Sequence, residues 1–224
     1  QLLPPARRRI KVIVNDRITA YIQSLDAGNG PLLDSVEEEG LADCVPIIRR
    51  ETSAFLKTLI ALKRPQSILE VGTAVGYSAL LMSRVMPENC RITTIEKYEK
   101  RIPIAKRNFD RAGKEPCITL LEGDAEEILG TLSGPYDFIF MDAAKGQYMH
   151  WLPQILRLLP SGGVLLSDNV LQDGDIVESR YAVERRNRTI HTRMRDYLYE
   201  LTHMKEFETS VFPIGDGVAL SVKR

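Results

Sequence analysis

Hydrophobic residues along the chain form short apolar runs that alternate with stretches of helical periodicity. The runs predict strands near residues 67–71, 91–95, 117–121, 136–141 and 162–167. Helical patterns lie between and after them, near residues 77–86, 98–112, 124–132, 147–158 and 184–203. This alternation predicts an α/β fold in which a mostly parallel sheet carries helices on both faces. Ligands are then expected beyond the carboxyl ends of the strands.

The segments that flank this alternating region complete one predicted domain. Asn15 is suited to cap an amphipathic helix, and a longer helix is expected near residues 47–62. At the other end, two β-runs between residues 207 and 221 predict an antiparallel hairpin. We therefore expect a single domain over residues 15–224, with a helical cap at 15–63 and a core at 64–224. Residues 1–14 are expected to be a disordered arm or an added remnant, with a basic nucleic-acid arm as the alternative.

Composition narrows the function classes without choosing one. The chain has 224 residues, which suits one α/β domain, and 30 basic residues balance 30 acidic ones. No global field therefore favours nucleic acid or membrane, and any such binding must be local. No apolar run approaches the roughly 18 residues of a membrane span. Cys44, Cys90 and Cys117 lack metal-type spacing and are predicted to be buried reduced thiols, which suits a cytoplasmic protein.

A glycine-bounded loop, Gly72 to Gly76, connects the first predicted strand to a helical pattern. Glycines tolerate positive φ and allow close approach of a ligand to the backbone. The loop lacks the G-x-G-x-x-G spacing of dinucleotide binders, and Glu70 before it would suit a cationic ligand better than a diphosphate. Glu96 ends the next apolar run, about 20 residues after the loop, where an acidic side chain can receive ribose hydroxyls. The alternative is that Glu96 only begins a surface loop.

Oxygen-bearing side chains follow two later strands. Asp142 comes directly after one apolar run, and Asp168 with Asn169 follows another. Three hard oxygen ligands at one edge of the sheet suit Mg²⁺, and the absence of thiolates argues against structural zinc. Lys145 lies close enough to take a proton if a cation or burial depresses its basicity. The alternative for Asp142 and Lys145 is a helix N-cap and a solvated lysine.

These segments, in this order, resemble the cation-dependent S-adenosylmethionine O-methyltransferases that include catechol and caffeoyl-coenzyme A methyltransferases. The resemblance extends from about residue 47 to the end of the chain. Its specific parts are Glu70–Ser78, Asp142–Lys145, Asp168-Asn169 and Gly215-Asp-Gly217. It implies a Rossmann-like methyltransferase fold with a seven-stranded sheet and a C-terminal antiparallel hairpin. It also implies an O-methyltransferase enzyme that uses S-adenosylmethionine and Mg²⁺, or Mn²⁺ or Ca²⁺, and forms a homodimer.

The resemblance, with position in the chain, assigns the predicted site residues. Lys145 and Asp142 are the expected catalytic pair, and Asp142, Asp168 and Asn169 are the expected metal ligands. The donor is expected to contact Glu70, Gly72, Thr73, Gly76, Tyr77, Ser78, Glu96, Asp124, Ala125 and Asp142. Asp124 also fits a simple helix N-cap. The three histidines, His150, His191 and His203, show no ligand spacing and receive no role.

An arginine-rich segment, residues 180–195, bears on the acceptor. Arginine matches phosphate with a planar fork, so we predict RNA contacts from Arg180, Arg185, Arg186, Arg188 and Arg193. The alternative is a solvated helix face. This segment, with Lys145–Tyr148 and Pro213–Gly217, is similar to the bacterial branch of the family that methylates 5-hydroxyuridine in the anticodon loop of transfer RNA. A splayed loop base could offer its 5-hydroxyl and O4 as catechol offers two oxygens.

Three other functions are weighed against transfer RNA methylation. The first is a catechol or hydroxycinnamoyl methyltransferase acting on a small phenolic substrate. An NAD-binding oxidoreductase is disfavoured by Glu70 and by the missing G-x-G-x-x-G spacing. A silent RNA-binding module would have no need of Asp142, Lys145, Asp168 and Asn169 together.

Overall fold

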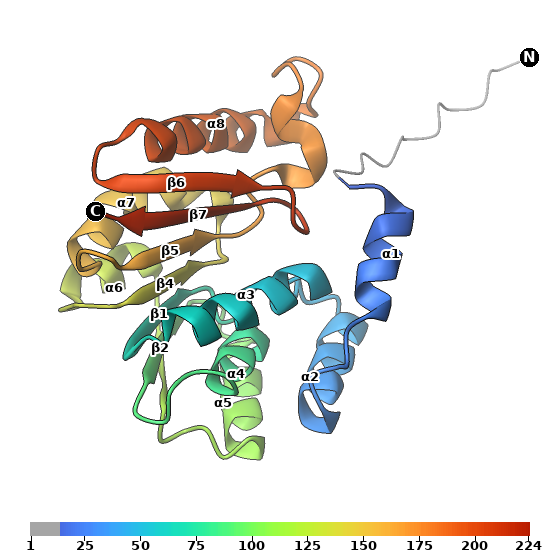
Figure 1. Ribbon diagram of the computed structural model, residues 1–224, viewed down its shortest axis with the longest axis vertical. Helices are drawn as coiled ribbons and strands as arrows, with labels where there is room; N and C mark the ends of the chain where they lie inside the picture. Colours follow the sequence, from blue (N-terminus) through green and yellow to red (C-terminus); the bar gives the residue numbers. More distant parts are fainter. Residues whose placement is uncertain (1–13) are drawn as a thin grey trace, which may run out of the picture.

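The apolar runs form one seven-stranded sheet in the order β3-β2-β1-β4-β5-β7-β6 (Figure 1). The computed structural model describes residues 14–224, so the predicted arm lies outside the described residues except for residue 14. The strands are β1 (Ser67–Val71), β2 (Arg91–Glu96), β3 (Ile118–Glu122), β4 (Phe138–Met141), β5 (Val164–Ser167), β6 (Phe207–Phe212) and β7 (Val218–Lys223). Pairing is parallel from β3 across to β5, and β7 runs antiparallel to both β5 and β6. The predicted fold class, including the terminal hairpin, is confirmed.

Helices cover both faces of the sheet. They are α1 (Asp16–Ser24), α2 (Pro31–Ala42), α3 (Arg50–Lys63), α4 (Tyr77–Ser83), α5 (Ile102–Arg111), α6 (Ala125–Thr131), α7 (Tyr148–Leu158) and α8 (Arg188–His203). Short 3₁₀ turns are η1 (Lys145–Gln147), η2 (Gln172–Val177) and η3 (Arg185–Asn187). Several helices are shorter than predicted. For example, α5 begins at Ile102 rather than near residue 98, with Pro103 in its first turn, where proline's fixed φ suits a helix start.

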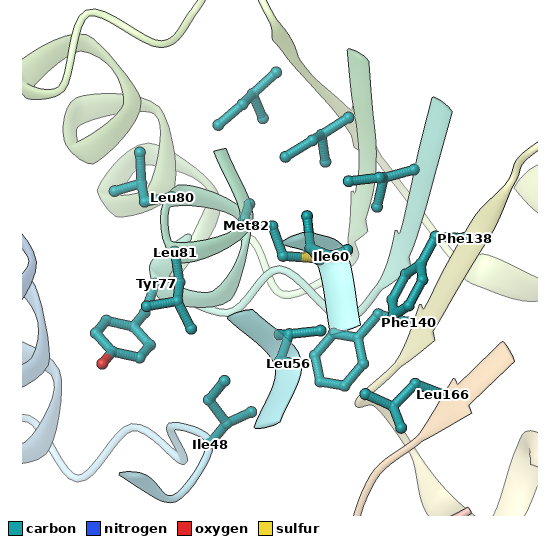
Figure 2. Close-up of a cluster of buried hydrophobic side chains, with 14 of the residues drawn as sticks. Ile48, Leu56, Ile60, Tyr77, Leu80, Leu81, Met82, Phe138, Phe140 and Leu166 are labelled. Carbon is teal, nitrogen blue, oxygen red and sulfur yellow. The ribbon is translucent and has the colours of Figure 1, made fainter. Parts of the chain in front are cut away.

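Alternation along the strands divides the buried side chains into two cores. Ile68, Phe138 and Phe140 point to the core shared with α2, α3, α4 and α5, part of which Figure 2 shows. Leu69 and Ile139 point to the opposite core, which α6, α7 and α8 cover. The central strands β4 and β5 are buried along their whole length, as expected for a parallel sheet with helices on both faces.

The N-terminal helices differ in how they pack. Asn15 caps α1 as predicted, because its Oδ1 accepts a hydrogen bond from the Arg17 amide at 2.9 Å. No residue of α1 is buried, and its apolar side chains Ile18 and Tyr21 are 53% and 66% exposed. By contrast, α2 buries Leu33 and Val36 against the first core. Within residues 14–224, no helix combines the length and apolar character needed to cross a membrane.

The cysteines do not all follow the prediction of buried thiols. Cys90 is buried, and burial raises the pKa of its thiol to about 11. Cys117 is half-buried, and Cys44 is exposed, so the prediction is wrong for Cys44. Cys44 lies after α2 in a left-handed conformation with φ 54°, at the surface connection to α3.

Candidate active site

A cavity of about 880 Å³ lies beyond the carboxyl ends of the central strands, where the fold class predicts ligands. Its size falls within the range of small-molecule sites, about 300–1,000 Å³. The lining residues include Pro46, Gly72, Ala74, Glu96, Tyr98, Asp124, Ala125, Asp142, Lys145, His150, Trp151 and Asn169. The cavity therefore joins the glycine loop after β1, the acidic ends of β2 and β4, and the loop after β5.

Glu70 lies beneath this cavity rather than on its wall. Its side chain is fully buried, and it accepts hydrogen bonds from Ser78 Oγ and Thr94 Oγ1, both at 2.5 Å. Thr73 Oγ1 lies 2.6 Å from Thr94 Oγ1 and extends this network. Burial raises the pKa of Glu70 to about 7, although both hydroxyl hydrogen bonds oppose that rise. Ser78, Thr73 and Glu70 thus form a buried support under the loop, and none of them lines the cavity.

The two glycines of the loop are required by close packing. Gly72 has φ 105°, and a Cβ there would lie 2.1 Å from the Asp142 carbonyl oxygen. Gly76 has φ 86°, and its Cβ would lie 2.6 Å from Phe109 Cε1. A side chain at either position would collide with its neighbour, so glycine is needed whether or not a ligand is bound. Gly72 also lines the cavity, whereas Gly76 packs against α5.

Tyr77 points away from the predicted donor position. Its ring is 3% exposed within the first core, and its hydroxyl accepts a hydrogen bond from Asn29 Nδ2 at 3.1 Å. Lys57 in turn donates to Asn29 Oδ1 at 2.6 Å. Tyr77 therefore ties the start of α4 to α3 and to the segment before α2, and a donor contact could come from its backbone alone.

Glu96 and Asp124 both line the cavity, and both carboxylates accept hydrogen bonds from backbone amides. The Glu96 carboxylate accepts hydrogen bonds from the amides of Ala74 and Tyr98, each at 2.8 Å. Asp124 Oδ1 accepts from the Glu126 amide at 2.9 Å, so it caps α6, and its Oδ2 lies 3.2 Å from Lys97 Nζ. The cap and Lys97 lower the pKa of Asp124. The N-cap alternative for Asp124 is thus present, and its carboxylate also faces the cavity beside Ala125.

Several cavity residues were missed from the sequence. Tyr98 and Arg101 line the side near β2, with the guanidinium carbon of Arg101 5.3 Å from the Tyr98 ring centre. His150 and Trp151 line the side near α7, and Trp151 Nε1 donates to Glu126 at 2.9 Å. Helical spacing could have indicated Trp151 from the sequence. Gln147 and Trp151 are four residues apart, so they share one helix face, and both line the cavity.

The ends of β4 and β5 bring two carboxylates together, as predicted. The parallel register aligns Met141 with Ser167, so Asp142 and Asp168 are the next residues on adjacent strands. Burial, then the Glu70 charge, raises the pKa of Asp142 to about 6. Burial, then the Asp142 charge, raises the pKa of Asp168 to about 7. Lys145 lowers both pKa values through its positive charge.

A buried tyrosine fixes the backbone around these carboxylates. The Tyr148 hydroxyl lies 3.0 Å from the Met141 carbonyl oxygen and 3.3 Å from the Asp168 carbonyl oxygen. It also accepts a hydrogen bond from the Ala143 amide at 3.3 Å. Asn169 adopts a left-handed conformation with φ 61°, and its amide donates to Asp168 Oδ1 at 2.8 Å. Asn169 lines the cavity, while Asp168 is 1% exposed behind it.

These side chains suit a divalent cation by their chemistry. Asp168 is buried, and the charge of Asp142 raises its pKa, while the charge of Glu70 raises the pKa of Asp142, so a positive charge beside these carboxylates would offset the repulsion. The amide oxygen of Asn169 would complete a set of hard oxygen ligands. Among residues 14–224, no group of three His, Cys, Asp or Glu residues could hold a metal ion; the predicted set consists of two such residues and an asparagine.

The predicted RNA-binding arginines have different environments. Arg188 donates to the carbonyl oxygens of Val183 and Tyr181 at 3.2 and 3.3 Å, and Arg193 donates to that of Gly146 at 3.0 Å. These two side chains hold the backbone beside α8 and η1. Arg186 pairs with Glu184 at 2.9 Å. Arg180 and Arg185 are exposed.

An α/β sheet in this strand order, with a nucleoside-sized cavity and acidic strand ends, defines the Rossmann-like methyltransferase class. The sequence model of an O-methyltransferase family matches residues 29–224, and the chain belongs to this family of S-adenosylmethionine-dependent enzymes.

The chain is similar to proteins named as O-methyltransferases and to a methyltransferase of known structure. Catechol O-methyltransferase of Niastella koreensis is 38% identical over 128 residues, which cover 55% of this chain and 58% of the relative. Caffeoyl-CoA O-methyltransferase 2 of Populus trichocarpa is 31% identical over 180 residues, covering 74% of this chain and 70% of the relative. The SAH-bound methyltransferase PaMTH1 of Podospora anserina superposes with a TM-score of 0.85 at 25% identity, covering 100% of this chain and 99% of that one.

Replacing Glu70 with Gln should change how stability depends on pH. The folded-state pKa of Glu70 is raised to about 7, so its contribution is fully present below the unfolded pKa of 4.5 and is lost as pH rises through 7. The free energy of unfolding of the wild type, relative to Glu70→Gln, should therefore fall by about 3 kcal/mol between pH 4 and pH 8. Urea unfolding at both pH values measures this difference. The exposed Glu88→Gln is the control, and an equal effect there would contradict the assignment.

Proposed function

We propose that this O-methyltransferase depends on a divalent cation and methylates a hydroxyl that has a second oxygen beside it on a planar ring. The observation that carries the proposal is that Asp142, Asn169 and Lys145 line one cavity, that Asp168 follows the strand paired with that of Asp142, and that the cavity is large enough for a nucleoside. Asp142, Asp168 and Asn169 would hold the cation. When bound, the cation would act as a Lewis acid that lowers the pKa of the acceptor hydroxyl.

The chain's own residues would then position both substrates. Gly72 lets the donor approach the backbone, Glu96 accepts hydrogen bonds from ribose hydroxyls, and Asp124 with Trp151 borders the adenine. The transferred methyl carbon leaves the sulfonium sulfur with its bonding electrons remaining on sulfur, while the acceptor oxygen forms the new bond. Lys145 lines the same cavity, and its amine, in the neutral form, would receive the proton that this oxygen loses.

Replacing Asp168 with Ala should abolish turnover and leave the donor in place. Asp168 is 1% exposed and does not line the cavity, so its loss removes a cation ligand without removing a donor contact. Calorimetry should give a dissociation constant for S-adenosylmethionine within about threefold of the wild type, with Mg²⁺ binding lost. Full wild-type activity in excess chelator would exclude the cation from the mechanism.

Lys145→Ala should lower kcat more than it raises KM for the acceptor. Loss of a general base typically costs about 10²–10⁴-fold in rate. Steady-state kinetics with a catechol at saturating donor separate the two parameters. Lys205→Ala, at an exposed position before β6 on the opposite edge of the sheet, is the control. An effect confined to KM would assign Lys145 to acceptor positioning.

Transfer RNA carrying 5-hydroxyuridine is the acceptor we propose first. Exposed Arg180 and Arg185, with Tyr181 82% exposed between them, lie on the segment that follows the Asp168-Asn169 loop. Arginine forks can bind phosphates, and an exposed aromatic ring can stack on an unpaired base. Arg188 and Arg193 donate hydrogen bonds to backbone carbonyl oxygens, so fewer arginines are available for phosphates than the sequence predicts.

A small phenolic acceptor is the second candidate. The similarity to a protein named as a catechol O-methyltransferase supports it, although the match covers 58% of that relative. Pro46 also lines the cavity, and its apolar side chain suits contact with a flat aromatic ring. Both candidates present adjacent oxygens to the same residues, so the acceptor test must compare them directly.

The acceptor test measures tritiated methyl transfer to 5-hydroxyuridine-containing transfer RNA beside a panel of catechols. If transfer RNA is the acceptor, Arg180→Glu with Arg185→Glu should lower its kcat/KM about 10-fold or more and reduce the salt slope by about 2. Activity on catechols should not change. Arg91→Glu with Arg224→Glu, at the opposite edge of the sheet, is the matched control. An unchanged rate on transfer RNA would favour the small acceptor.

A further inference from the structure

A charge cluster joins three segments that lie far apart in the chain, two of them next to residues that line the cavity. Arg49 directly precedes α3, Asp173 lies in η2, and Asp216 lies in the turn between β6 and β7. Arg49 Nη2 donates to Asp173 Oδ1 at 2.5 Å and also contacts Asp216 Oδ1. We call these three residues the mouth clamp. Pro46, just before it in the chain, lines the cavity, and so does Asn169, just before η2.

The hairpin tip that carries Asp216 is already bonded to the loop after Asn169. The amides of Val170 and Leu171 donate to the carbonyl oxygens of Gly217 and Asp216, both at 2.9 Å. Gly217 has φ 86°, and a Cβ there would lie 2.2 Å from Leu171 Cγ. A Cβ at Gly215 would lie 2.5 Å from Thr52 Oγ1 in α3. The tip therefore packs against the loop on one side and against the start of α3 on the other.

The loop held in this way has a strained backbone. Asn169, Gln172 and Asp173 all have positive φ, at 61°, 50° and 53°. A non-glycine residue in this region costs on the order of 1–3 kcal/mol and persists when its surroundings over-determine it. Asp173 is itself a member of the mouth clamp, and Asn169 is a proposed cation ligand. If Asp173 lost its contact with Arg49, the strained backbone could relax, and this change would extend to Asn169.

Arg49 forms ion pairs with both carboxylates of the mouth clamp. The Asp216 side chain is 16% exposed, and its Oδ1 contacts Arg49 as an ion pair without a hydrogen bond of its own. Burial and the hydrogen bond with Asp173 raise the pKa of Asp216 to about 7. Exposed ion pairs contribute little to stability, but here one guanidinium holds two adjacent carboxylates, one of them largely buried.

We propose that Arg49 is a positioning residue for methyl transfer. Through the mouth clamp it holds the strained Asn169–Asp173 loop and the hairpin tip against the start of α3, so that Asn169 and Lys145 stay aligned around the acceptor. The part of this proposal that concerns the acceptor rests on the proposed function. The part that concerns the backbone of residues 169–173 does not.

The test compares Arg49→Gln with the wild type in the full chain. The amides of Val170 and Leu171 should lose about 10-fold or more of their hydrogen-exchange protection, measured by NMR, because local opening becomes easier. The kcat/KM for a catechol or transfer RNA should fall about 10- to 100-fold, since small misplacements of reacting groups are costly. The dissociation constant for S-adenosylmethionine should stay within about twofold, because none of the three residues of the mouth clamp lines the cavity.

Two further variants distinguish positioning from general stability. Arg49→Lys keeps the charge but not the two-pronged geometry, and it should recover part of the lost protection. Arg111→Gln breaks a comparable ion pair between α5 and Glu39 of α2, away from the cavity, and should leave both exchange and kinetics unchanged.

The outcomes separate the two proposals. Wild-type exchange at Val170 and Leu171 in Arg49→Gln would overturn the mouth clamp, whatever the acceptor. Loss of donor binding together with a global loss of protection would reduce Arg49 to a structural role and would also overturn it. If the wild type methylates neither acceptor, or needs no divalent ion, the proposed function fails while the exchange measurement still decides the mouth clamp.

Discussion

Parallel pairing of β4 with β5 is the constraint on which the candidate site depends. Its register makes Asp142 and Asp168 the first residues beyond two adjacent strands, so both carboxylates leave the sheet at one edge. The Tyr148 hydroxyl lies within hydrogen-bonding distance of backbone atoms from both strand ends. The pKa of each carboxyl is raised by burial and by neighbouring negative charge, so the folded chain holds two acids that a cation would stabilise.

The rest of the fold supplies the stability that this arrangement requires. Two apolar cores, one on each face of the sheet, bury the central strands β4 and β5 along their length. Glu70 is a further buried carboxyl behind the site, and it accepts hydrogen bonds from the hydroxyls of Ser78 and Thr94. The strained loop after β5 adds a further local cost. Buried acids and unfavourable φ angles are tolerated in a domain whose hydrophobic burial outweighs them.

The sequence predicted the sheet and its acidic edge because both follow from local pattern. Apolar runs locate strands, and a carboxylate after each run marks the ligand-binding edge. The side-chain direction of Glu70 could not be derived from the sequence, because alternation gives it only once the structure shows that the adjacent Val71 lines the cavity. The environments of Arg188, Arg193 and Arg49 could not be derived either. Each depends on contacts between segments far apart in the chain, which composition and spacing do not encode.

Gly72 connects the two halves of the site mechanically. With a Cβ position only 2.1 Å from the Asp142 carbonyl oxygen, the loop after β1 and the turn after β4 touch through main-chain atoms. Neither segment can shift without displacing the other, so the loop after β1 and the turn after β4 form one rigid side of the cavity. Differences in acceptor preference are then expected from the segments on the other side: the connection between α2 and α3, the loop after β5 and the hairpin tip.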